Sequence, residues 1–186
     1  MLSRKHPNNN FTRENLRDTA GISAIGIGLF IVLRWLTPIS HIPSVSMEPT
    51  IAEDSRVLVN NTRFWFDSPQ RGDVVVFDSG YRAGLLQREK VRLTKRVIGL
   101  PGERIEVTPA GRVSIDGQVL QEAYAIPATD AYPPTVIPEG HYFVMGDNRD
   151  NSHDSRVLGA IAADRIEGKV SVILWPLETF SVELQP

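Results

Sequence analysis

KVSVILW, residues 169–175, is a run of mostly β-branched and large apolar residues, the composition of a β-strand. Five further runs of this kind are bounded by Gly, Pro, Asp or Asn: residues 56–59, 73–77, 104–107, 113–115 and 141–145. Thr108–Gly111 and Asp116-Gly117, which border two of these runs, are turn sequences typical of hairpins. The sequence after residue 50 therefore predicts an all-β domain, a sandwich or a partly open barrel of antiparallel strands.

The composition is that of an ordinary globular protein, with 186 residues, of which 41% are hydrophobic and 23% charged. A formal net charge of -2 argues against a surface that neutralises phosphates, so we expect no nucleic-acid partner. The absence of Cys excludes thiolate nucleophiles, thiolate metal sites and disulfides. A chain of this length can form one domain around its own hydrophobic core.

An apolar segment precedes the strands. Ala20–Leu33 contains no charged residue, and its apolar character continues past Arg34 to Ile39. About 20 such residues are needed to cross a bilayer, so we expect one transmembrane helix over residues 19–39. The alternatives are a buried core helix and a cleavable signal peptide that ends at the small residues Ser44-Val45-Ser46. Residues 1–18 contain four basic residues and residues 39–58 only one, which predicts a cytoplasmic N-terminus with the remainder of the chain outside.

Two segments contain candidate catalytic residues. Ile42–Thr50 places Ser44 and Ser46 between prolines, where serine is more often a turn residue than a nucleophile. Lys95 lies in an apolar stretch of a chain that otherwise uses arginine for most of its cations. A buried ammonium, unlike a guanidinium, can lose its proton, so Lys95 is a candidate base. The alternative is a lysine on the solvent face of a strand.

A third segment, which we call the polar loop (Gly146–Arg156), follows the strand expected at residues 141–145. It consists of polar and turn-forming residues and is longer than a tight turn requires. A calcium loop is a poor alternative, because the spacing is not that of an EF-hand and the arginines would repel a divalent ion. The polar loop is therefore a candidate part of a functional site.

Two kinds of nucleophilic site are compatible with these residue types. A Ser-His-Asp triad needs a histidine, and His41, His141 and His153 are the candidates after the apolar segment. His153 adjoins Asp154, but adjacent residues on a strand point to opposite faces. A Ser-Lys dyad needs only a hydroxyl and a neutral amine about 3 Å apart, with burial lowering the pKa of the amine.

In this order, and after an N-terminal apolar segment, the three segments resemble the boxes of type I signal peptidases, the membrane-bound Ser-Lys proteases that remove signal peptides from exported proteins. The resemblance runs from about Pro43 to Pro176. It implies a β-fold like that of signal peptidases and repressor-type proteases, with one transmembrane helix. The resemblance implies a cytoplasmic segment (residues 1–18), a transmembrane helix (residues 19–39) and an extracytoplasmic catalytic domain in two parts (residues 40–102 and 141–186). Residues 103–140 are expected to form a small inserted hairpin subdomain without chemistry of its own.

The resemblance also implies roles for single residues. Ser46 is expected to be the nucleophile and Lys95 the general base. Ser44 is expected to contribute its hydroxyl to the oxyanion hole beside the Ser46 N–H, and Ser152 to orient the Lys95 amine. No metal ion or organic cofactor is implied.

Other residues are expected to support the site. Ile42 and Met47 flank the nucleophile and are expected to line the pocket for the substrate residue before the scissile bond. Thr94 and Glu103 depart from the family pattern, and Thr94 is expected to weaken the desolvation of the neighbouring lysine. The remaining residues are expected to hold the polar loop by salt bridges: Asp147, Arg149, Asp154 and Arg156.

The implied activity is that of a membrane-anchored serine endopeptidase that cuts exported preproteins after small-x-small sites such as Ala-x-Ala. The implied partners are preproteins with signal peptides, the phospholipid bilayer and the protein export machinery, and the implied location is the bacterial plasma membrane. Two alternatives stay open. One is an inactive anchored β-domain that binds exported peptides, and the other is a self-cleaving Ser-Lys protease of the repressor type.

Overall fold

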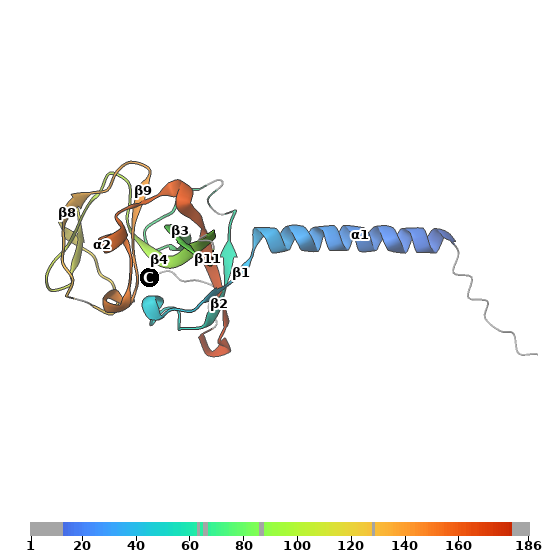
Figure 1. Ribbon diagram of the computed structural model, residues 1–186, viewed down its shortest axis with the longest axis horizontal. Coiled ribbons are helices and arrows are strands. Elements are labelled where there is room, and N and C mark those ends of the chain that lie inside the picture. The colour runs from blue at the N-terminus through green and yellow to red at the C-terminus, as the bar shows by residue number, and fades with distance from the viewer. Residues whose placement is uncertain (1–12, 63, 65–66, 86–87, 128, 180–186) are drawn as a thin grey trace, which may run out of the picture. The chain divides into compact units, whose positions relative to one another are not determined.

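The structure, a computed structural model, describes residues 13–62, 64, 67–85, 88–127 and 129–179 (Figure 1). The chain divides into two units, Met1–Leu36 and Thr37–Pro186. Residues 1–12, which make up most of the expected cytoplasmic segment, lie outside the described residues.

In the first unit, Arg13–Leu36 form helix α1. The helix ends before Thr37, because a residue that precedes proline disfavours the α conformation and Pro38 follows. Ile39 then begins strand β1 (Ile39–Ile42), so the helical part of the predicted span is shorter at this end. Among the described residues, no helix combines the length and the apolar character that crossing a membrane requires. The predicted transmembrane helix over residues 19–39 is therefore not supported by the structure.

The second unit is built from antiparallel strands, which confirms the all-β prediction for this part of the chain. Among the residues that the structure describes, one sheet has seven strands in the order β1-β2-β11-β3-β4-β9-β10, and the other has four in the order β7-β6-β5-β8. After β1 the strands are β2 (Ser55–Asn60), β3 (Val74–Ala83), β4 (Glu89–Gly99), β5 (Arg104–Val107), β6 (Val113–Ile115), β7 (Gln118–Val119), β8 (Tyr132–Val136), β9 (His141–Met145), β10 (Ile161–Ala162) and β11 (Ile166–Trp175).

The bounds of β5, β6 and β9 agree with the runs that predicted them. The predicted turn at Asp116-Gly117 joins β6 to β7, and its φ values of 50° and 82° are those of a hairpin turn with both central residues in the left-handed region. The four-stranded sheet consists of residues from the 103–140 insert. Strand β8 lies within residues 122–140, a proline-rich stretch with little hydrophobic periodicity that the sequence alone suggests to be a loop.

Short helices connect the strands, and two of them bring the candidate residues together. Helix η1 (Val45–Met47) carries Ser46 and contacts both β4 and η3 (Arg149–Asn151). The others are α2 (Ser155–Leu158), η4 (Ala163–Arg165) and η5 (Leu177–Thr179). The first candidate segment, the strand with Lys95 and the polar loop therefore meet at one place in the second unit.

Candidate active site

Ser46 lies on the single turn of η1 and is buried, with 4% of its surface exposed. Ser44 caps this turn, because its Oγ accepts a hydrogen bond of 3.2 Å from the backbone N–H of Ser46. The turn therefore holds the Ser44 hydroxyl next to the Ser46 N–H, the two groups for which the resemblance implies an oxyanion hole.

Lys95 projects from β4, where it pairs with Val75 of β3, and only 2% of its surface is exposed. Its Nζ lies 2.6 Å from Oγ of Ser46 and donates a hydrogen bond of 3.0 Å to the carbonyl oxygen of Thr94. Burial lowers the pKa of Lys95 to about 8, against opposing contributions from Asp154 and Asp147. The amine is therefore placed and tuned to exchange a proton with the Ser46 hydroxyl.

The polar side chain of Thr94 does not open the site to water. Thr94 is itself buried, and successive residues on a strand point to opposite faces, so its hydroxyl is directed away from the Lys95 side chain. Its contact with Lys95 is made through the backbone carbonyl. The pKa of Lys95 is lowered with Thr94 as its neighbour, and the expected weakening of the desolvation by Thr94 stays a prediction.

The polar loop packs directly on the turn that carries Ser46. The backbone N–H of Asn148 donates to the carbonyl oxygen of Ser46 over 3.1 Å. Gly146 leaves no room for a side chain, because a Cβ at this position would lie 2.3 Å from Oγ of Ser152 and 2.5 Å from the Ser46 carbonyl oxygen. This close approach needs a glycine, and it fixes where the loop begins relative to Ser46.

Ser152 has a different partner from the one expected. Its hydroxyl donates a hydrogen bond of 2.7 Å to Oδ2 of Asp154, which also accepts from the backbone N–H of Gly146 over 3.0 Å. Among the described hydrogen bonds none joins Ser152 to Lys95, so the orienting role of Ser152 stays a prediction. In this structure Ser152 belongs to the hydrogen-bonded group around Asp154.

Asp154 is fully buried and is bridged by Arg156, with an Nε–Oδ1 distance of 2.9 Å. Burial alone would raise the pKa of Asp154, but the hydrogen bonds and charge of Arg156, with Ser152 and Gly146, outweigh it and lower the pKa. Arg156 also donates to the carbonyl oxygen of Arg149 over 2.6 Å. Asp154 is therefore an ionised anchor that ties both ends of the polar loop together.

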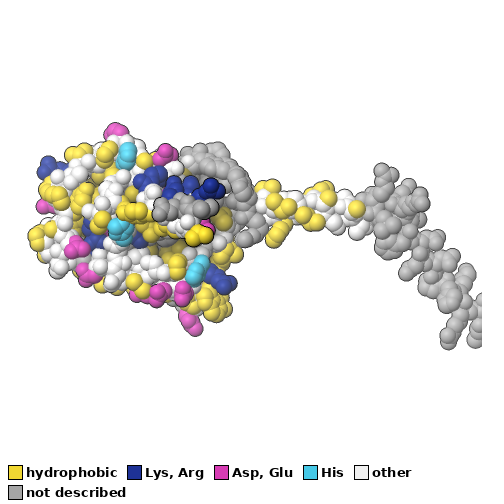
Figure 2. Space-filling model, viewed as in Figure 1, with side chains coloured by type: hydrophobic (Ala, Val, Ile, Leu, Met, Phe, Trp, Pro, Cys, Tyr) yellow, Lys and Arg dark blue, Asp and Glu magenta, His cyan; other side chains and the backbone are white. Residues whose placement is uncertain are grey.

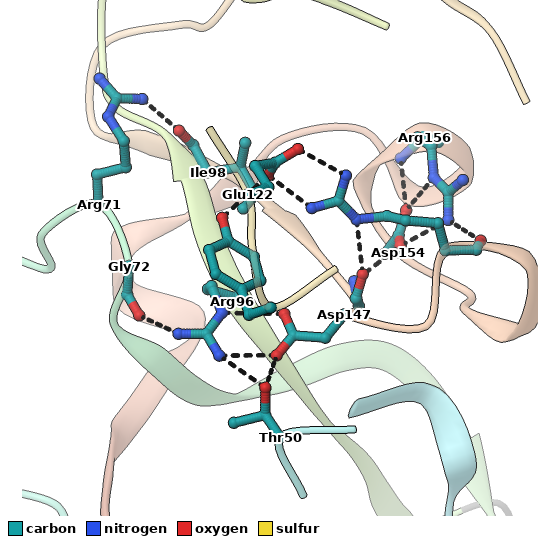
Figure 3. A network of polar contacts seen from close by, with 12 residues as sticks. Thr50, Arg71, Gly72, Arg96, Ile98, Glu122, Asp147, Asp154 and Arg156 are labelled. Atoms are coloured by element: carbon teal, nitrogen blue, oxygen red, sulfur yellow. Dashed lines mark hydrogen bonds and ion pairs between the residues drawn. The ribbon is translucent and has the colours of Figure 1, made fainter. Parts of the chain in front are cut away.

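A buried ion pair connects the polar loop to β4. Arg96 donates to both carboxylate oxygens of Asp147 over 2.9 and 2.7 Å, and the two side chains are 1% and 0% exposed (Figure 3). Thr50 donates to Oδ2 of the same carboxylate over 2.6 Å, and Arg96 donates to the carbonyl oxygen of Gly72. Planar bidentate pairing of this kind fixes direction as well as distance. Arg96, which follows the candidate base Lys95 on β4, is thus bound to the polar loop.

The remaining residues predicted for the site do not take part in the contact between Ser46, Lys95 and the polar loop. Ile42 and Met47, the last residue of η1, belong to one hydrophobic core cluster, with 5% and 0% of their surfaces exposed, and their role in a substrate pocket stays a prediction. His153 is exposed, and its Nε2 lies 3.4 Å from the hydroxyl of Tyr81. Its described hydrogen bonds do not involve Ser46, so the structure offers no support for a histidine base.

Sequence reasoning missed the inserted residues that reach the site. Glu122 receives two hydrogen bonds from Arg149, of 3.0 and 2.6 Å, and the ring of Tyr124 lies 4.2 Å from Cζ of Arg96. Both come from a proline-rich stretch without periodicity, and nothing in the local sequence pairs them with residues so far along the chain. These contacts are structural, and the prediction that residues 103–140 have no chemistry of their own stays a prediction.

A hydroxyl beside a buried amine, with two hydrogen-bond donors at the same turn, is the minimal arrangement for attack on a carbonyl group. The family model "Signal peptidase, peptidase S26" matches residues 16–175 of the chain. A signal peptidase I of Leptolyngbya laminosa is 37% identical over 89% of this chain and 83% of its own length. A signal peptidase IB of Staphylococcus aureus is 32% identical over 94% of this chain and 96% of its own. A crystal structure of a signal peptidase I from Enterococcus faecalis is 33% identical, with a TM-score of 0.44 over 56% of this chain and 97% of that one.

Proposed function

The chain belongs to the S26 family of signal peptidases, and from this premise we propose that it is a membrane-attached serine endopeptidase with Ser46 as nucleophile and Lys95 as general base. Membership makes it a signal peptidase I, an enzyme that removes signal peptides from preproteins. The proposal adds the catalytic residues, the mechanism and the membrane attachment. The observation that carries it is the 2.6 Å distance between Lys95 Nζ and Ser46 Oγ.

In the first step neutral Lys95 accepts the proton of the Ser46 hydroxyl while Oγ attacks the carbonyl carbon of the scissile bond. The protonated amine then gives its proton to the leaving amine, and an acyl-enzyme with the signal peptide remains on Ser46. Water, deprotonated by the same amine, attacks the ester and releases the peptide. Lys95 suits both directions of transfer, because its pKa of about 8 lies close to the working pH.

The oxyanion formed in each attack needs donors at the position of the developing charge. The Ser46 N–H and the Ser44 hydroxyl lie within one turn and are 3.2 Å apart as donor and acceptor. In the transition state both groups donate to the oxyanion, so the hydrogen bond between them is replaced by two hydrogen bonds to the oxyanion. Preproteins with small residues such as Ala before the cut are the expected substrates.

The rate of preprotein cleavage is expected to rise with pH and to level off above about pH 8, the pKa of Lys95. Below that pH most of the enzyme carries a protonated Lys95, which cannot accept the Ser46 proton, so kcat/KM falls about tenfold per pH unit. The measurement is the pH dependence of kcat/KM for a purified preprotein with an Ala-x-Ala site. EDTA and the His153→Ala change are expected to leave the profile unaltered. A midpoint at about 6.5 that disappears in His153→Ala would identify a histidine base instead.

Membrane attachment is proposed to use the apolar segment, residues 19–39. In its support, Ala20–Leu33 contains no charge, and the side chains of residues 19–32 are exposed, many of them apolar (Figure 2). Exposed apolar side chains in such number are costly in water and favourable in lipid. The bacterial plasma membrane, with the N-terminus in the cytoplasm, is the proposed location, and the export machinery is the proposed source of preproteins.

The full-length protein is expected to float with phospholipid vesicles in a density gradient. Replacing Ile25 and Leu29 together by Asp is expected to abolish flotation, because two charges on one face of α1 oppose insertion. Leu85→Asp is the control, since Leu85 is also an exposed apolar residue but belongs to the second unit. Flotation of the double variant at the wild-type level would contradict attachment through this segment.

A further inference from the structure

One backbone stretch of the insert (residues 103–140) contacts the polar loop of the active site. We propose that this bridging segment (Glu122–Ile126) positions the polar loop against Ser46. Glu122 and Tyr124 are then positioning residues of the peptidase. The inference rests on the proposed function, because it takes Ser46 and Lys95 as nucleophile and base.

Backbone hydrogen bonds run without interruption from the bridging segment to the nucleophile. The N–H of Ile126 donates to the carbonyl oxygen of Asp147 over 2.8 Å, and the N–H of Arg149 donates to the carbonyl oxygen of Ile126 over 3.2 Å. These bonds form a short parallel bridge between Ile126 and Asn148. Asn148 in turn donates to the carbonyl oxygen of Ser46. A shift of the bridging segment is therefore transmitted to the turn that carries Ser46.

Glu122 fixes the start of the polar loop through one arginine. Its carboxylate accepts two hydrogen bonds from the guanidinium of Arg149, and the two side chains are only 10% and 3% exposed. The Nε of the same guanidinium donates to the carbonyl oxygen of Gly146 over 2.9 Å. Charge-assisted bidentate pairs are directional, so Glu122 determines where the guanidinium lies and, through it, where Gly146 lies. Gly146 is the residue at which even a Cβ would clash with Ser46 and Ser152.

Tyr124 acts on the neighbour of the base. Its ring covers the guanidinium of Arg96, which follows Lys95 on β4 and pairs with Asp147. Its hydroxyl donates to Glu122 over 2.9 Å. Burial, together with the charge of Glu122, raises the pKa of Tyr124, so the hydroxyl stays protonated and remains a donor. A single side chain thus contacts both ion pairs that hold the polar loop.

The charged groups that act on Lys95 belong to the same loop. Asp154 and Asp147 raise its pKa and Arg156 lowers it, while burial has the largest effect. A polar loop that loses its fixed position admits water to Lys95 and weakens that burial. The pKa of Lys95 then moves back toward its ordinary value of 10.5, and the distance to Ser46 becomes variable.

The test compares steady-state cleavage of an Ala-x-Ala preprotein by the full-length enzyme and three variants. Glu122→Gln removes the charge that holds Arg149, and kcat is expected to fall about 100-fold with KM changed less than about threefold. Tyr124→Leu removes the ring and is expected to lower kcat about tenfold. Tyr124→Phe keeps the ring over Arg96, and its kcat is expected to stay within about threefold of wild type. In the first two variants the midpoint of the pH profile is expected to move to higher pH.

Glu103→Gln is the matched control. Glu103 also forms an Arg–Glu pair between the insert and the larger part of the unit, with Arg71 at 2.5 Å, but its described bonds do not reach the polar loop. All variants are compared at a temperature where thermal unfolding curves show them folded. The inference is overturned if Glu122→Gln and Tyr124→Leu keep the kcat and pH midpoint of Glu103→Gln. Full activity of Ser46→Ala would instead overturn the proposed function, so the two failures are distinguishable.

Discussion

Lys95→Met is expected to abolish preprotein cleavage and at the same time to stabilise the fold. The loss of the proposed base is expected to lower kcat by a factor on the order of 10⁴ or more, as removal of a catalytic nucleophile or base does in serine proteases. The stabilisation arises because Lys95 is 2% exposed and has a lowered pKa, so the folded protein holds an amine that would be charged in the unfolded chain. Met fills a similar volume without that cost.

The gain in stability depends on pH in a defined direction. Above pH 10.5, the ordinary pKa of Lys, the amine is neutral in both folded and unfolded protein and Lys95 carries no protonation cost. As the pH falls toward about 8 the unfolded chain takes up a proton that the folded protein does not, and below about 8 the cost is constant. A shift of this size corresponds to about 3 kcal/mol. Chemical denaturation of wild type and Lys95→Met at pH 7 and above pH 10 measures the difference.

Ser46→Ala separates the two effects. It is expected to lose activity to the same extent as Lys95→Met, because the nucleophile is absent, but to gain no comparable stability, because the buried amine remains. Residual cleavage by Lys95→Met at a tenth of the wild-type rate would exclude Lys95 as the base. Equal free energies of unfolding for Lys95→Met and wild type at pH 7 would show that folding does not lower the pKa of Lys95.

Asp147→Asn is expected to destabilise the fold by about 3–5 kcal/mol, because it leaves the buried guanidinium of Arg96 without its counter-charge. The free energy of unfolding from urea denaturation measures the loss. The asparagine side chain keeps only one acceptor oxygen for the three donors on Thr50 and Arg96, so the bidentate pairing of the polar loop with β4 is lost. We therefore expect cleavage activity to fall together with stability.

The double variant Arg96→Met with Asp147→Leu distinguishes charge from position. Well-packed apolar residues can replace a buried ion pair at little cost, so most of the stability is expected to return. Activity is expected to stay low, because apolar contacts do not fix the direction of the polar loop as the bidentate pair does. Recovery of both stability and activity would show that the pair serves folding alone.

The sequence predicts the parts of this protein that depend on local patterns. β-Branched runs bounded by turn residues predict β5, β6 and β9, and the positive φ values at Asp116-Gly117 are those that a tight hairpin requires. The candidate dyad could be named because the family boxes around Ser46 and Lys95 are distinctive. Ser46 and Lys95 are 49 residues apart in the sequence, and the fold brings their side chains together.

What the sequence does not predict depends on contacts between distant residues. Glu122 and Tyr124 lie in a stretch without periodicity, and only the folded chain places them on Arg149 and Arg96. Met47 is apolar and next to the nucleophile, which suits a pocket and a core equally well, and it lies in the core. Spacing in the sequence cannot predict whether the Ser152 hydroxyl contacts Asp154 or Lys95, and in the structure it donates to Asp154.

Strand β4 presents two cations in succession, and its register decides which of them does chemistry. Val75 opposite Lys95 on β3, and Met145 opposite Arg96 on β9, fix that register on both sides. A slip by one residue in one direction would set a guanidinium that cannot lose its proton beside Ser46, and a slip in the other direction would set the Lys95 ammonium against Asp147 and Thr94 beside Ser46. Every hydrogen bond that keeps the two neighbouring strands aligned therefore also selects the titratable cation over the permanent one at the nucleophile.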